Sequence, residues 1–191
     1  MTDMKDMRLE RTEQRLDKMI DIIKSRQKID HGFLNDDTPK LAHRICSDYF
    51  GKNPYRPKMP INVAAASLYL ADLALNTYPQ EGKYVFHSYH LQQGFFGYVK
   101  FLLEREELSK KDTKNHGNEH VNEEMSYNNM YNDSRVLSKR SSVGIACKDI
   151  LKSFGFRSDS GIVHHDARYI AEIGGFLQNE YHISLRPRFL G

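Results

Sequence analysis

The sequence predicts an all-α protein, and three observations lead to this fold class. Residues 60–76 form the longest stretch with almost no charge, and they are rich in alanine and leucine, which are strong helix formers. Apolar residues recur every three or four positions in most of the remaining chain, which is the spacing of a helix face. Strand-like patterns are confined to the β-prone residues 84–86 and to a short alternation of apolar and polar residues at 181–185.

The 60–76 segment is expected to form a buried helix around which the other helices pack. Pro60 suits its first turn, where a missing N–H is no loss, and Asp72 is its only charged residue. A helix that is apolar on nearly all sides belongs inside a bundle. At about 1.5 Å per residue it is roughly 24 Å long, which is short of a bilayer span.

Two helices are expected before this central helix. The first runs from about residue 6 to residue 28, with an apolar stripe on one face and charged residues on the other. The second has Thr38 as its N-cap and Pro39 in its first turn, and it ends at Gly51. The basic connector 52–58 contains two prolines, which prevent a helix there.

Four helices are expected after the central one. Gly94 and Gly97 separate the first two, although the β-prone residues 84–86 leave a strand open as an alternative. Gly155 ends the third helix, and the pair of glycines at 174–175 weakens or kinks the fourth. The expected helices are 83–93, 96–108, 141–154 (with Ser141 and Ser142 as a cap) and 160–178, and a short strand at 181–185 follows.

The composition changes between residues 109 and 134. This stretch is rich in Asn, Lys and Glu and has no apolar periodicity, so burial cannot offset the cost of ordering it. We expect a flexible linker or a long surface insertion. The chain then divides into a helical bundle at 1–108, the linker or insertion at 109–134, and a small basic helical unit at 135–191.

The length and composition are those of a soluble protein that can bury a hydrophobic core. The chain has 191 residues, of which 39% are hydrophobic and 28% are charged. The first 26 residues are charged and periodic, so we expect no signal sequence and no membrane partner. Cys46 and Cys147 lie far apart, which excludes a four-cysteine zinc site and favours an intracellular location. Both fall on apolar helix faces and are interpreted as small core residues.

Positive charge is concentrated toward the C-terminus. Residues 135–191 contain nine Lys or Arg against five acids, which leaves four positive charges. Clustered cations are what contact with a nucleic-acid backbone needs, and such contact is independent of base sequence. The candidate nucleic-acid-binding residues lie in the loop before the central helix, before the penultimate helix and at the end of the chain: Lys52, Arg56, Lys58, Lys139, Arg140, Arg186 and Arg188.

The central helix carries the pattern P-x-x-V/I-A-A-A-x-x-Y-x-A, which is matched by Pro60, Val63, Ala64, Ala65, Ala66, Tyr69 and Ala71. This pattern, together with the order of the expected helices, resembles the first cyclin-like repeat of the transcription factor IIB type general factors. The resemblance covers residues 6–108, and residues 98–104 resemble the fifth helix of that repeat. The resemblance implies a five-helix bundle around an Ala-rich third helix. Because no N-terminal zinc ribbon is present, it implies a divergent or truncated initiation factor.

A metal-dependent hydrolase is the alternative of enzymatic type. His164, His165 and Asp166 are residue types that ligate metals in phosphohydrolases. Such a site needs further ligands from other helices, and the chain offers His43, Asp48, His87 and His90, which no spacing forces together. The sequence has no nucleophile motif of the G-x-S-x-G type and no glycine-rich nucleotide-binding loop. We therefore expect no catalytic residue, no metal and no cofactor.

The sequence thus favours a non-enzymatic module that associates with nucleic acid, with duplex DNA and a protein as its partners. The alternative from another class is a helical protein-interaction or structural module. In that case the aromatic segment 84–101 would contact another polypeptide. The two hypotheses differ in the salt dependence that binding would show.

Overall fold

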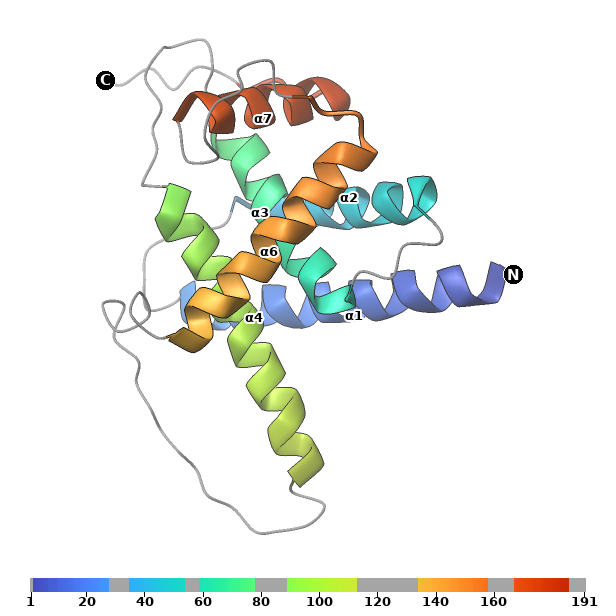
Figure 1. The fold of residues 1–191 in the computed structure, drawn as a ribbon, viewed down its shortest axis with the longest axis vertical. Coiled ribbons are helices and arrows are strands. Elements are labelled where there is room, and N and C mark those ends of the chain that lie inside the picture. Colours follow the sequence, from blue (N-terminus) through green and yellow to red (C-terminus); the bar gives the residue numbers. More distant parts are fainter. Residues whose placement is uncertain are drawn as a thin grey trace.

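The computed structural model describes residues 2–27, 35–53, 59–77, 89–112, 134–157 and 167–185. These residues form six α-helices and no strand, which confirms the all-α fold class (Figure 1). The helices are α1 (Thr2–Gln27), α2 (Thr38–Lys52), α3 (Pro60–Asn76), α4 (Tyr89–Asp112), α6 (Ser134–Ser153) and α7 (Ala167–Glu180).

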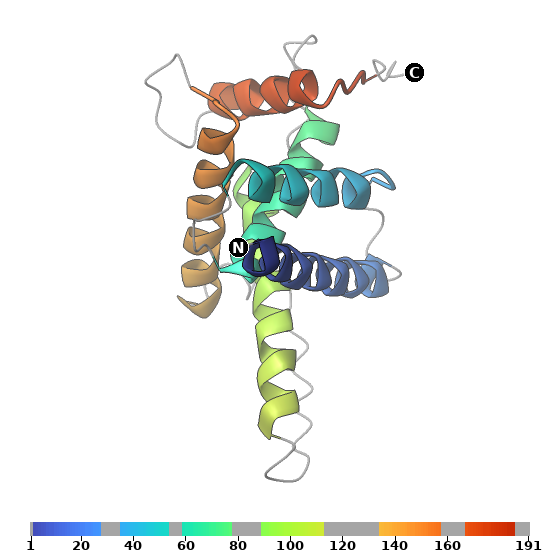
Figure 2. The same ribbon diagram turned by 90° about the vertical axis from the view of Figure 1, so that its right-hand side faces the viewer.

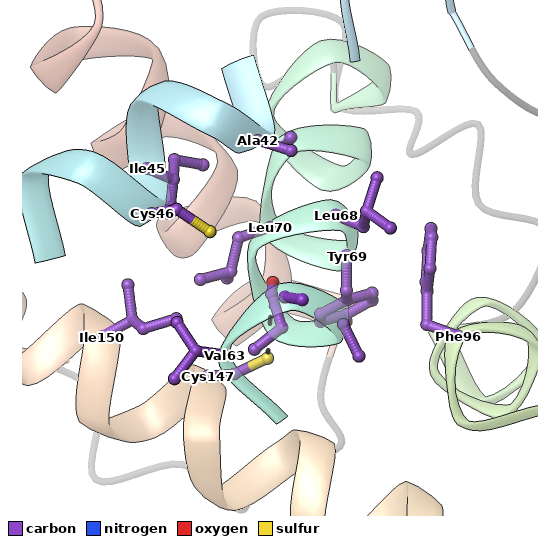
Figure 3. Close-up of a cluster of buried hydrophobic side chains, with 14 of the residues drawn as sticks. Ala42, Ile45, Cys46, Val63, Leu68, Tyr69, Leu70, Phe96, Cys147 and Ile150 are labelled. Atoms are coloured by element: carbon purple, nitrogen blue, oxygen red, sulfur yellow. Dashed lines mark hydrogen bonds between the residues drawn. The ribbon is translucent and has the colours of Figure 1, made fainter. Parts of the chain in front are cut away.

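Helix α3 has the predicted bounds and the predicted central place. It packs against each of the other five described helices, and all but three of its side chains are buried. Pro60 occupies its first turn, and no side chain caps that end. Figure 3 shows Cys46 of α2 and Cys147 of α6 close beside this helix. Ala64, Ala65 and Ala66 are fully buried, so neighbouring helices approach its backbone closely.

One continuous hydrophobic core joins all six described helices. It contains Leu16 of α1, Ile45 of α2, Leu103 of α4, Ile150 of α6 and Leu177 of α7, together with the apolar residues of α3. Side chains from the predicted 1–108 and 135–191 units therefore share a core. Figure 2 shows α6 along one edge of the molecule, α7 across one end, and the second half of α4 extending beyond the other helices.

Helix α4 corrects the prediction of two helices separated by glycine. It runs without a break from Tyr89 through Gly94 and Gly97 to Asp112. Each helical glycine costs about 1 kcal/mol relative to alanine. Burial of Phe96, with Val99 and Leu103, outweighs this cost. Of the predicted helix at 83–93, residues 89–93 belong to α4, and residues 83–88 lie outside the described residues.

The region predicted as a linker is partly helical. Residues 109–112 belong to α4 and Ser134 begins α6, while 113–133 lie outside the described residues. The predicted cap at Ser141 and Ser142 is wrong, because α6 begins at Ser134, about two turns earlier. Thr38 is likewise the first helical residue and not the N-cap, which is Asp37. The first residues of the predicted 160–178 helix also lie outside the described ranges.

Helices α6 and α7 end in the same geometry. At α6 the predicted stop, Gly155, has φ +87°, and the N–H of Phe156 bonds the carbonyl of Leu151 at 3.0 Å. This pattern satisfies carbonyls that the helix end would leave unpaired. His182 takes the corresponding position after α7, with φ +54°. The strand predicted at 181–185 is therefore wrong, because these residues close a helix.

Candidate nucleic-acid interface

The structure describes the side chain of only one predicted DNA-binding residue. Lys52 is the last residue of α2. Lys139 and Arg140 lie in α6, and their side chains are outside the described part. The remaining four, Arg56, Lys58, Arg186 and Arg188, fall outside the described residues altogether.

The side chain of Lys52 contacts residues at the ends of two other helices, α6 and α7. Its Nζ lies 3.1 Å from Oε1 of Glu180 on α7 and 4.6 Å from the ring centre of Phe154 at the end of α6. Both contacts hold the ammonium group and offset part of its charge. The structure therefore gives Lys52 a role in joining α2 to α6 and α7.

The same junction contains further polar and aromatic contacts. The guanidinium of Arg44 lies 5.0 Å from the ring centre of Tyr181, and the Tyr181 and Phe154 rings meet edge to face. Burial, and then the charge of the nearby Asp48, raises the pKa of Tyr181. These contacts hold the C-terminal helices against α2, and they engage the two cations of the junction, Arg44 and Lys52, within the protein.

The exposed face of α6 is the more basic surface. In residues 142–157 the exposed ionisable side chains are Lys148, Lys152 and Arg157, and all three are cations. No described residue forms an ion pair with any of them. The one acid of this stretch, Asp149, accepts a hydrogen bond from the Tyr49 hydroxyl of α2. We call Lys148 and Lys152 the basic face of α6, and Arg157 lies four residues beyond the end of this helix.

Sequence reasoning counted the lysines of this face in the net charge but did not select them. The signal that identifies them is their register, because Lys148 and Lys152 are four residues apart and out of phase with the buried Val143 and Ile150. Clustering along the chain favoured Lys139 and Arg140 instead. Arg140 precedes the buried Cys147 by two helical turns and does not share the register of Lys148 and Lys152.

The two cysteines are core residues, as predicted. Cys46 is fully buried and its thiol donates a hydrogen bond to the Ser67 hydroxyl over 3.1 Å. Burial raises the pKa of Cys46 to about 12 and raises the pKa of Cys147 as well, against a small opposing effect of their hydrogen bonds. A thiol with a raised pKa is a poor nucleophile because little thiolate forms near neutral pH.

The described residues do not gather a set of metal ligands. Among them no three His, Cys, Asp or Glu side chains lie as a metal ion would require. His43 of α2 is 2.8 Å from a carboxylate oxygen of Asp17 on α1, which is a contact between helices. The hydrolase candidates His164, His165, Asp166 and His87 lie outside the described residues, as does the side chain of His90.

Comparison with known proteins adds no family assignment. Searches with protein-family models, with curated proteins and with solved structures gave no match to the chain. None of the described helices is both long and apolar enough to cross a membrane.

Proposed function

We propose that this chain is a non-enzymatic nucleic-acid-associated module that binds the phosphate backbone of duplex DNA through the basic face of α6. The observation that carries the proposal is that every exposed ionisable side chain of residues 142–157 is a cation. None of these cations is neutralised by an ion pair with another described residue.

The physical basis is the release of counterions. A lysine placed against a phosphate displaces a condensed cation from DNA, and this gain does not depend on base sequence. The position of α6 at an edge of the molecule supports the proposal, because an extended duplex can approach an edge more easily than a recess (Figure 2). The resemblance of residues 6–108 to the cyclin-like repeat supports the proposal that the chain is a divergent relative of the transcription initiation factors.

The test is binding of a duplex DNA fragment by fluorescence anisotropy over a series of salt concentrations. Affinity should fall steeply with salt, and replacing Lys148 and Lys152 together by glutamate should weaken it most at low salt. The slope of log K against log salt should become shallower by about 1.8, because two phosphate contacts are lost.

A matched control uses two other exposed lysines. Lys18 and Lys24 lie on the exposed face of α1, and replacing both by glutamate changes the net charge by the same amount. We expect the slope of this variant to stay close to that of the unmodified protein. Equal losses in both variants would show only a response to net charge. No binding even at low salt would refute the proposal and leave the protein-interaction hypothesis.

A further inference from the structure

Helix α6 places a large apolar side chain within its basic face. Ile145 is 56% exposed, and it precedes Lys148 by three residues and Lys152 by seven, so the three share one side of the helix. A β-branched residue has a lower helix propensity than a straight-chain residue at such a position. Its apolar surface also stays in water in the free protein. A partner that buries this side chain would recover the hydrophobic free energy.

A DNA major groove can accommodate such a helix face. The groove is about 12 Å wide and admits an α-helix. From Ile145 to Lys152 the helix rises about 10.5 Å, so the isoleucine can reach the groove floor while the lysine meets the backbone. The groove floor carries one apolar group, the C5-methyl of thymine, which matches an isoleucine and no charged side chain.

We infer that Ile145 contacts thymine methyl groups in the major groove, so that the module prefers duplexes with thymine over the same duplexes without the methyl group. This inference rests on the proposed function, because the lysines must first bring α6 to the backbone. Lysine alone contacts phosphate without discriminating between sequences, whereas an apolar contact with a base edge discriminates.

The test replaces thymine by uracil in an otherwise identical DNA duplex, which removes only the methyl group. The unmodified protein should bind the uracil duplex more weakly, by about fourfold for each methyl group contacted. Ile145→Ala should bind both duplexes equally. Its affinity should be near that of the unmodified protein for the uracil duplex.

The control variant is Leu108→Ala, which removes an apolar side chain of similar exposure from α4. This variant should keep the preference for thymine. If the unmodified protein binds both duplexes equally with a steep salt dependence, the inference fails and the proposed function stands. A thymine preference that persists in Ile145→Ala also refutes it, and an absence of binding to either duplex refutes both.

Discussion

Asp72 is the most unusual single residue of the core. It lies one turn before the C-terminal end of α3 and is only 3% exposed. The side-chain amide of Asn76 donates a hydrogen bond to its Oδ1 over 2.9 Å and another to its backbone carbonyl. Burial raises the pKa of Asp72 to about 7, and the hydrogen bond from Asn76 opposes part of this rise. The residue therefore titrates near neutral pH inside the bundle.

This pKa predicts how stability depends on pH. In the unfolded chain the carboxyl ionises at about pH 4, so between that pH and about pH 7 the folded state holds a proton that the unfolded state releases. The contribution of Asp72 to the free energy of unfolding is therefore complete at low pH and declines as the pH rises through about 7.

Asp72→Asn should remove this decline, because the amide stays neutral and its oxygen still accepts from Asn76. Urea unfolding at about pH 5 and at about pH 8 measures the effect. We expect the two proteins to differ in stability mainly at the higher pH, with the asparagine variant the more stable. An unchanged pH dependence in the variant would show that Asp72 does not titrate in this range.

At the scale of elements, the contact between α3 and α7 depends on one glycine of a pair. A methyl group on Gly174 would lie 2.6 Å from the side chain of Thr77, just after the end of α3. Gln178, one turn later, donates to the carbonyls of Ala74 and Thr77 over 2.8 and 2.6 Å. A methyl group on Gly175 would meet nothing within 4 Å. Gly174 therefore permits the close approach of α7 to the end of α3, whereas Gly175 has no such role.

Substitution by alanine should separate them. Gly174→Ala should destabilise the protein by about 1–3 kcal/mol, because the helices cannot keep their distance. Gly175→Ala should stabilise it by up to about 1 kcal/mol through helix propensity alone. Thermal and urea unfolding of both variants measure these changes. If both stabilise, Thr77 has moved aside and the close approach is not required.

The elements could be predicted from the sequence where local signals decide. The period of apolar residues identified α1, α2 and α3, and Gly155 correctly marked the end of α6. Glycine misled the prediction in α4, because the cost of a helical glycine is local while the burial of Phe96 depends on partners far along the chain. The 174–175 pair was interpreted as a weak point for the same reason.

At the scale of the whole molecule, every described helix depends on α3. Ala65 is fully buried on this helix, and it belongs to the hydrophobic core. Ala65→Glu should therefore abolish cooperative folding, because burying an unpaired charge costs several kcal/mol against a total stability of about 5–15 kcal/mol.

Circular dichroism during heating measures this outcome. Placing the same glutamate at the exposed Ser47 of α2 is the control, and it should leave a cooperative transition. A soluble Ala65→Glu protein with a normal transition would contradict the central place of α3.

The candidate interface was less predictable than the fold. Counting charges along the chain selected Lys52, but the fold brings Glu180 and Phe154 to it from more than a hundred residues away. The same counting did not select Lys148 and Lys152. These lysines stand among core residues in the sequence, and only their position on the helix shows that they face away from the core. Tertiary packing determines which cations stay exposed. The sequence pattern identifies the exposed cations only once the buried face of the helix is known.

The shared core also constrains when the chain can fold during its own synthesis. Helix α3 lies in the first half of the sequence, yet part of its surface is covered only by α6 and α7. A ribosome adding about 5–20 residues per second needs several seconds to proceed from α3 to the end of α7. During that interval the most apolar of the described helices lacks two of its neighbours, so we expect the nascent chain to expose apolar surface and to be prone to aggregation until α7 is complete.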